Sequence, residues 1–228
     1  MQQKKNYMIE NKKTKIFVSI LNEGFIKSEL AFMLIQWLNT IDYQIYLEMP
    51  SDRPIENNRN MIVQRFLKSD ADYLIQIDND NVPPENPLKL ISLMKEQNID
   101  ILSCPVWIYQ HKLILNIYKL DKTDGMLVPV DPEKEKGLIE IDATGTGILL
   151  TSRKVLEVIK KPFERKYDEN GIEELGQDLY FSRKAKNAGF KIFSHLNYIS
   201  KHYKLIDLGI LQKVNNSNNN NIRFCKEL

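Results

Sequence analysis

The sequence predicts an α/β domain in which a mostly parallel central sheet is flanked by helices. Short apolar runs alternate with amphipathic stretches from Ile16 to Cys104, in the order strand, helix, strand, helix, strand, helix, strand. This alternation is typical of parallel sheets with right-handed crossovers. After Cys104, paired extended runs flank Asp124-Gly125, which is a hairpin signal. We therefore expect a small antiparallel excursion between Lys112 and Val130.

The first half of the predicted domain is read from its hydrophobic spacing. Ile16–Leu21 and Tyr43–Leu47 are strand candidates, and Ser28 is placed to cap the helix between them. Glu48–Asn58 is expected to be a polar loop before a helix that ends near Lys68. The helix after Ser28 should face the sheet through a stripe at helical spacing. That stripe consists of Leu30, Met33, Leu34, Trp37, Leu38 and Ile41.

The second half contributes fewer regular elements. Asn86 precedes a predicted helix from Leu88 to Gln97, and Ile99–Ser103 resumes a strand. The glycine-rich stretch before Ile148 leads into another strand, and a helix from Gln177 to Ala188 should be closed by Gly189.

Composition narrows the classes of function. The 228 residues include 32 Lys and Arg against 30 Asp and Glu, which gives a net charge of +2. This balance provides no electrostatic basis for nucleic acid as a general partner. Hydrophobic residues make up 43% of the chain, enough for a core. No stretch approaches the roughly 20 apolar residues that cross a bilayer, so we expect no membrane span, although peripheral association stays open.

The predicted domain occupies residues 15–212. Residues 1–14 are expected to form a flexible basic leader without the apolar run of a secretory signal, and residues 213–228 an asparagine-rich flexible tail. Cys104 and Cys225 lie far apart, which indicates neither a disulfide framework nor a thiolate zinc site. A cytoplasmic location is the expectation.

The most informative stretch is the apolar run Tyr73–Ile77, which stops at Asp78-Asn79-Asp80 and two prolines. A buried strand of this kind places both carboxylates at the carboxyl edge of the sheet, where ligands bind in open α/β folds. Oxygen ligands of this type suit Mg²⁺ or Mn²⁺. The alternative is a solvated turn in which the two acids bond only to their own backbone.

Other candidate residues each have a structural explanation as well. Arg59 is either a surface helix residue or a guanidinium suited to a diphosphate. Asp178 opens a helix, where an acid is either a simple partner of the helix dipole or an ionised general base. His202 is either a structural histidine or a ligand that completes a divalent-metal site.

The order of these elements resembles the GT-A-fold glycosyltransferases, especially small members of the family-two-like group. The resemblance extends from Lys15 to Leu205 and rests on four motifs. They are Arg59-Asn60, the strand ending in Asp78-Asn79-Asp80, Asp142-Ala143-Thr144-Gly145-Thr146-Gly147, and Gly176-Gln177-Asp178-Leu179-Tyr180-Phe181 followed by Ala188-Gly189-Phe190.

The resemblance implies roles for individual residues. Asp80 would bind the metal and Asp78 the ribose or sugar of a nucleotide-sugar donor. Asp178 matches the catalytic base, and His202 corresponds to a histidine that ligates the metal. Ser19 would lie beside the nucleotide base. The chain departs from the group at Gln177, where Glu is usual, and Glu173 and Glu174 stay open as alternative bases.

The resemblance implies a metal-dependent glycosyltransferase that moves a sugar from a nucleotide-diphosphate sugar to a carbohydrate or other hydroxyl acceptor. The metal, Mn²⁺ or Mg²⁺, and Arg59 would neutralise the departing diphosphate, while a carboxylate on the opposite side of the sugar takes the acceptor proton, giving inversion. Two alternatives stay open. One is a nucleotidyltransferase on a related fold, and the other is a non-catalytic module that binds a sugar nucleotide or glycan.

Overall fold

The computed structural model describes residues 13–51, 54–110 and 112–205, and every structural statement below concerns these residues. The predicted tail and all but the last two residues of the predicted leader lie outside them. Over the described part of the chain, no helix combines the length and the apolar character that crossing a bilayer requires.

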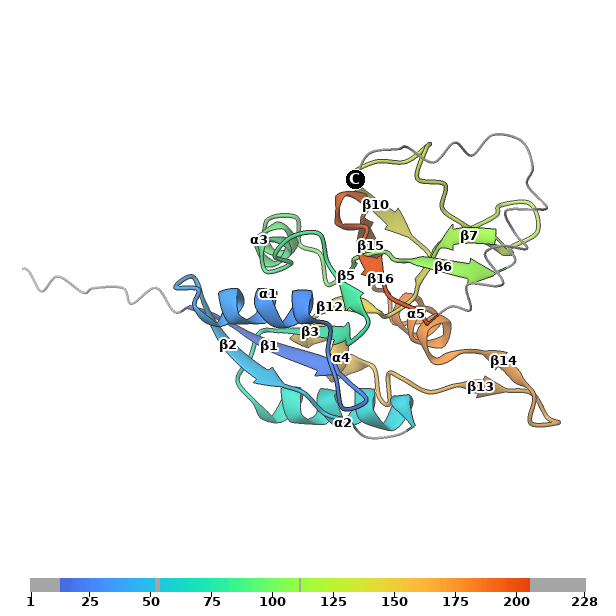
Figure 1. Ribbon diagram of the computed structural model, residues 1–228. Helices are drawn as coiled ribbons and strands as arrows, with labels where there is room; N and C mark the ends of the chain where they lie inside the picture. Colours follow the sequence, from blue (N-terminus) through green and yellow to red (C-terminus); the bar gives the residue numbers. More distant parts are fainter. Residues whose placement is uncertain (1–12, 52–53, 111, 206–228) are drawn as a thin grey trace, which may run out of the picture.

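A seven-stranded sheet forms the centre of the molecule, in the order β10-β15-β5-β12-β3-β1-β2 (Figure 1). β12 runs antiparallel to both of its neighbours and β10 antiparallel to β15, so the other five strands point the same way. The mostly parallel sheet predicted from the sequence is therefore confirmed. The strands are β1 (Thr14–Leu21), β2 (Tyr43–Glu48), β3 (Tyr73–Asp78), β5 (Ile101–Ser103), β10 (Leu138–Ile141), β12 (Ile148–Ser152) and β15 (Ile192–His195).

Helices cover both faces of this sheet, because neighbouring residues of a buried strand point to opposite sides. Ile16 and Val18 of β1 pack in one apolar cluster with α1 (Ser28–Leu38) and α3 (Lys89–Glu96). Phe17 belongs to the other cluster, with α2 (Ile55–Lys68), α4 (Arg153–Val158) and α5 (Gln177–Asn187). Figure 1 shows α1 and α3 on one side of the sheet and α2 on the other.

Helix α1 differs from its prediction. It ends at Leu38, which is 50% exposed, and Ile41 lies beyond its end and is 79% exposed. The buried stripe is confined to Leu30, Leu34 and Trp37, because Leu38 lies at the rim of that face. The residue that caps the helix is Lys27 rather than Ser28, and its side chain makes no capping hydrogen bond.

The boundaries of two other elements also shift. Helix α2 begins at Ile55, four residues before Arg59, so the loop predicted over residues 48–58 is shorter than expected. The sequence also predicts a helix that Ser152 caps and that runs through Lys160. Helix α4 ends at Val158, and Ser152 is its N-cap residue, but the Ser152 hydroxyl donates to Asp100 and accepts no backbone N–H of the helix.

The antiparallel excursion is present and begins earlier than Lys112. A hairpin pairs β6 (Trp107–Gln110) with β7 (Lys112–Leu115), and β8 (Ile117–Leu120) lies between β9 (Leu127–Pro129) and β11 (Ala143–Thr144). The turn between β8 and β9 contains Gly125 at φ +72°, a backbone conformation that favours glycine.

Three small elements complete the described fold. Strand β4 (Asn81–Val82) pairs with β16 (Lys201–His202), and β13 (Lys166–Tyr167) pairs with β14 (Glu173–Leu175). A single 3₁₀ turn covers Leu196–Tyr198. The β4/β16 pair brings the end of the described chain beside Asp78, the last residue of β3, and Asp80, which follows it.

Arg153 closes the carboxyl end of α2. Its guanidinium donates hydrogen bonds to the backbone carbonyls of Phe66, Leu67, Ser69 and Ala71, at 2.7–3.3 Å. Arg153→Met should lower the free energy of unfolding by about 2–4 kcal/mol, because the carbonyls lose a charged donor. Urea denaturation measures this loss.

Lys154→Met is the matched control, since Lys154 makes a single ion pair with Asp100 and its side chain is 66% exposed. It should change stability by less than about 1 kcal/mol. Equal effects of the two substitutions would contradict the role given to Arg153.

Candidate active site

The acid pair lies at the carboxyl edge of the central sheet, as predicted. Asp78 is the last residue of β3, and Asp80 precedes β4. The backbone N–H of Asp78 donates to the carbonyl of Gly147 at 2.8 Å, and that of Asn79 donates to Leu21 at the end of β1 at 2.9 Å. These two bonds fix the acids between two neighbouring strands.

Asp78 forms an ion pair with Arg59 of α2, with 2.7 Å between Oδ1 and Nη2. The Arg59 side chain is 1% exposed, and its Nε and Nη1 have no hydrogen-bond partner among the described residues. Burial raises the pKa of Asp78 to about 6, against the opposing effect of Arg59 and with help from the nearby Asp178 and Asp80. Arg59 is thus the buried counterion of Asp78, on the side of the carboxylate that faces the protein interior.

Asp80 is surrounded by two basic side chains. Its Oδ2 lies 2.6 Å from Nζ of Lys204 and 3.6 Å from Nε2 of His202. Burial alone would raise the pKa of Asp80, but the hydrogen bonds from His202 and Lys204 hold it below its usual value. The hydrogen bond with Asp80 raises the pKa of His202, whose Nδ1 bonds to the carbonyl oxygen of Trp107 at 2.8 Å.

Asp80 and His202 are the residues that would hold a divalent ion. No cluster of three or more His, Cys, Asp or Glu side chains suited to a metal occurs among the residues that the structure describes. One carboxylate and one imidazole within 3.6 Å of each other fit an ion that takes its remaining ligands from phosphate oxygens and water. Asp78 is already paired with Arg59.

Asp178 approaches the same edge from α5. It is the second residue of that helix, and its carboxylate accepts a hydrogen bond from the hydroxyl of Thr146. Farther along the helix, the Ser182 hydroxyl accepts from the backbone N–H of Thr144 at 3.2 Å. These bonds tie the start of α5 to the Thr144–Gly147 turn.

The glycines of this turn are required by two asparagines. A Cβ atom on Gly145 would overlap the carboxamide of Asn116, and one on Gly147 would lie 2.7 Å from Nδ2 of Asn81. The motif therefore lets side-chain amides pack directly on the backbone beside Asp78 and Asp178.

Two adjoining cavities lie at this edge. One, of about 390 Å³, is lined by Asp78, Asp178 and His202 among others. The second, of about 700 Å³, is lined by Asn22, Lys27, Asp78 and Asp80 among others. Both also include Arg165 and Lys204 in their walls, so they form two parts of one region.

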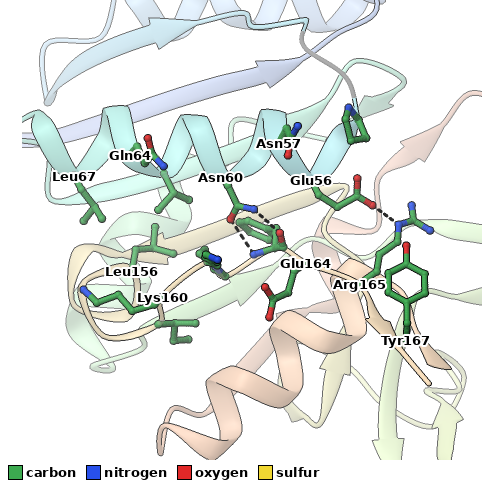
Figure 2. Close-up of a pocket in the computed structure, with 16 residues that line it drawn as sticks. Glu56, Asn57, Asn60, Gln64, Leu67, Leu156, Lys160, Glu164, Arg165 and Tyr167 are labelled. Atoms are coloured by element: carbon green, nitrogen blue, oxygen red, sulfur yellow. Dashed lines mark hydrogen bonds and ion pairs between the residues drawn. The ribbon is translucent and has the colours of Figure 1, made fainter. Parts of the chain in front are cut away.

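A third cavity, of about 1030 Å³, lies between α2, α4 and residues 159–167 (Figure 2). Of the four sequence motifs, it includes one residue in its lining, Asn60. Asn60 of the Arg59-Asn60 motif faces it and bonds to the backbone of Phe163, with its Oδ1 accepting at 3.1 Å. Asn60 therefore ties helix α2 to the backbone of Phe163.

Ser19 and Arg59 do not line any of these three cavities. Ser19 is fully buried two residues before the end of β1, and its hydroxyl has no partner among the described residues. Leu21 and Asn22 line the 700 Å³ cavity in its place. The strand runs farther than Ser19, which is why the predicted contact falls inside the sheet.

Neither of the alternative bases lines the two cavities of this region. Glu173 pairs with Arg165 and Glu174 with Lys166 on the β13/β14 hairpin. Neither glutamate lines the cavity that contains Asp178.

Sequence reasoning missed several residues of the site. Asn81, Asn116, Arg165 and Lys204 line the 390 Å³ cavity, and Lys27 lines its neighbour. Lys204 had a usable signal, since it follows His202 by two residues and so lies on the same side of an extended segment. Asn116 had none.

Comparisons with known proteins show the fold and no family. No protein-family model matches the sequence, and no curated protein matches it. Among solved structures, A197 from STIV superposes with a TM-score of 0.57 at 20% identity, over 85% of this chain and 86% of that one. UDP-glucose pyrophosphorylase complexed with UDP-glucose gives a TM-score of 0.47 at 9% identity, over 90% and 98% of the two chains. The protein therefore belongs to the α/β class by its fold, and its own structure places a polar site at the carboxyl edge of the central sheet.

The raised pKa of Asp78 predicts a pH dependence of stability. In the folded chain this carboxyl has a pKa of about 6, against an ordinary value of 3.8. Between these values the native state holds more protons than the unfolded state, so the free energy of unfolding should fall as the pH rises from about 4 to about 7. Asp78→Asn should remove this part of the decrease.

Urea denaturation of both proteins at several pH values isolates the effect, because every other carboxyl is common to the two. A difference in stability that does not change with pH would contradict the raised pKa.

Proposed function

We propose that this protein is a metal-dependent glycosyltransferase that moves a sugar from a nucleotide-diphosphate sugar to a hydroxyl acceptor with inversion. One observation carries the proposal: Asp178 lines the same cavity as Asp78 and His202 while belonging to a different element. Displacement at the anomeric carbon needs a base for the acceptor hydroxyl and positive charge near the leaving diphosphate. Asp178 is the base, and His202 would help to hold the metal that carries the positive charge.

The donor binds across the region that the two cavities share. Lys27 lines the 700 Å³ cavity and, together with the metal, supplies positive charge for a diphosphate. Asp80 and His202 would hold Mn²⁺ or Mg²⁺, which would supply positive charge against the departing diphosphate. Asp78 accepts hydrogen bonds from donor hydroxyls, and Arg59 keeps it in position from beneath.

The acceptor side is built around Asp178. The Thr146 hydroxyl holds the carboxylate in one orientation by donating a hydrogen bond to Oδ1. The other carboxylate oxygen takes the proton of the acceptor hydroxyl. The acceptor oxygen then bonds to the anomeric carbon while the bond from that carbon to the diphosphate oxygen breaks, and the nucleoside diphosphate leaves. Because the base and the leaving group lie on opposite sides of the sugar, the product has inverted configuration.

A donor screen tests this proposal. We expect at least one nucleotide-diphosphate sugar, in the presence of Mn²⁺, to raise the unfolding temperature more than its parent nucleoside diphosphate does. A donor at 100 times its dissociation constant stabilises a fold by about 2.7 kcal/mol, which such a screen detects. A panel covering uridine, guanosine and deoxythymidine sugars that gives no stabilisation would contradict the proposal.

The assignment of the base makes a second prediction. Asp178→Asn nearly preserves shape and removes basicity, so the rate of transfer should fall by roughly 10²- to 10⁴-fold while donor affinity is retained. Steady-state kinetics and calorimetry measure the two quantities separately.

Glu174→Gln is the control for that prediction, because Glu174 pairs with Lys166 on the hairpin. It should leave turnover near that of the unsubstituted protein. If Glu174→Gln abolishes transfer and Asp178→Asn does not, the base has been misassigned.

The metal assignment predicts that Asp80→Ala and His202→Ala reduce the gain in donor affinity that Mn²⁺ provides, by roughly 10- to 100-fold for each substitution, because each removes a ligand or its support. Calorimetric titration of donor with and without Mn²⁺ gives this gain directly. His195→Ala is the matched control, since His195 lies against Tyr198 outside the site. An unchanged gain in both site variants would remove Asp80 and His202 from the metal site.

A further inference from the structure

Three buried carboxamide side chains line the 390 Å³ cavity, which also contains the glycine turn. Asn81, Asn116 and Gln177 all line this cavity, and their exposed fractions are 1%, 8% and 8%. They come from β4, from the segment between β7 and β8, and from the first position of α5. Such a cluster of buried amides requires hydrogen-bond partners.

Not all of these amides find partners within the protein. The Oδ1 of Asn116 accepts from the backbone N–H of Val106 at 2.8 Å, and the Nδ2 of Asn81 donates to Asp80 at 3.2 Å. The Oδ1 of Asn81 and the Oε1 of Gln177 have no partner in the described part of the chain. An unpaired buried acceptor is destabilising by about 1–3 kcal/mol, so a donor from a bound ligand is the natural explanation.

The charges around the cavity restrict what that ligand is. Its acids are Asp78 and Asp178, and each cation in its wall is already paired with a carboxylate. Arg165 bonds to Glu56 and Glu173, while Lys204 and His202 lie against Asp80. A carboxylate on the ligand would therefore face two acids without a free cation among these groups. Hydroxyl groups, in contrast, both donate to and accept from carboxamides.

We propose that this cavity binds an uncharged, polyhydroxylated sugar ring, and that Gln177 determines this specificity by accepting a hydrogen bond from a ring hydroxyl. The inference rests on the proposed function and names the class of sugar. A volume of about 390 Å³ is near the lower end of ligand sites and suits one ring. Gln177 precedes Asp178 directly, so a glutamate there would add a negative charge beside the base.

The test separates the sugar's contribution to binding from that of the nucleotide. Calorimetry with Mn²⁺ gives dissociation constants for UDP-glucose, UDP-galactose, UDP-N-acetylglucosamine, GDP-mannose and dTDP-glucose, and for UDP, GDP and dTDP. For each nucleotide sugar, the sugar gain is the dissociation constant of the parent nucleoside diphosphate divided by the dissociation constant of the nucleotide sugar. Gln177→Met keeps the length of the side chain and removes its hydrogen bonds.

We expect Gln177→Met to lower the sugar gain by roughly tenfold, the worth of one buried hydrogen bond, and to leave the nucleoside diphosphate affinity unchanged. The uronate counterpart of the best donor, such as UDP-glucuronate or GDP-mannuronate, should show little or no gain. Gln64→Met, on the exposed side of α2 and outside this cavity, is the matched control and should change nothing.

The other outcomes are distinguishable. A sugar gain that survives Gln177→Met overturns the role of Gln177 and leaves the proposed function standing. An equal loss of nucleoside diphosphate affinity shows a merely structural role and also overturns the inference. A uronate that binds more tightly than its neutral counterpart overturns the class of sugar. If no donor in the panel has a gain, the proposed function itself fails.

Discussion

The arrangement of the site depends on the buried ion pair between Arg59 and Asp78. Removing the Arg59 guanidinium and most of the Asp78 carboxylate from water carries a desolvation penalty, and two of the buried guanidinium nitrogens have no hydrogen-bond partner among the described residues. The pKa of Asp78 nevertheless rises to about 6, so Arg59 offsets only part of the effect of burial. Carboxyl groups with strongly perturbed pKa values cluster at functional sites. This pair anchors the last residue of β3, and the neighbouring groups are positioned from there.

A continuous set of hydrogen bonds spreads outward from that anchor. The N–H of Asp78 bonds to Gly147, and the adjacent Thr146 bonds to Asp178 at the start of α5. On the other side, the carbonyl of Asp80 accepts from Tyr203 at 2.8 Å, which holds the segment of His202 and Lys204 beside it. Groups that are more than 120 positions apart in the sequence are thereby fixed around one region. Preorganisation of this kind is what charge stabilisation and proton transfer require.

The sequence allowed the sheet, the acid pair and its edge position to be predicted, because they depend on local hydrophobic period and on abrupt strand ends. Residues that depend on tertiary packing were not predictable in the same way. Asn116 reaches Gly145 only because the excursion folds back over the turn, and nothing in its neighbours signals that contact. Arg59 has the spacing of an ordinary helix residue, and only the packing of α2 shows that its guanidinium is buried. Leu38 and Ile41 fit the apolar period but lie at or beyond the end of α1, which periodicity alone does not locate.

The identity of the leaving group tests the central claim most directly. The protein is incubated with Mn²⁺, a nucleotide-diphosphate sugar that binds in the screen and a set of carbohydrate acceptors, and the products are separated by anion-exchange chromatography. Glycosyl transfer predicts release of the nucleoside diphosphate together with a glycosylated acceptor. Release of a sugar 1-phosphate when pyrophosphate is supplied would indicate nucleotidyl transfer instead. Tight binding with neither product would indicate a binding module, and either result would contradict the account.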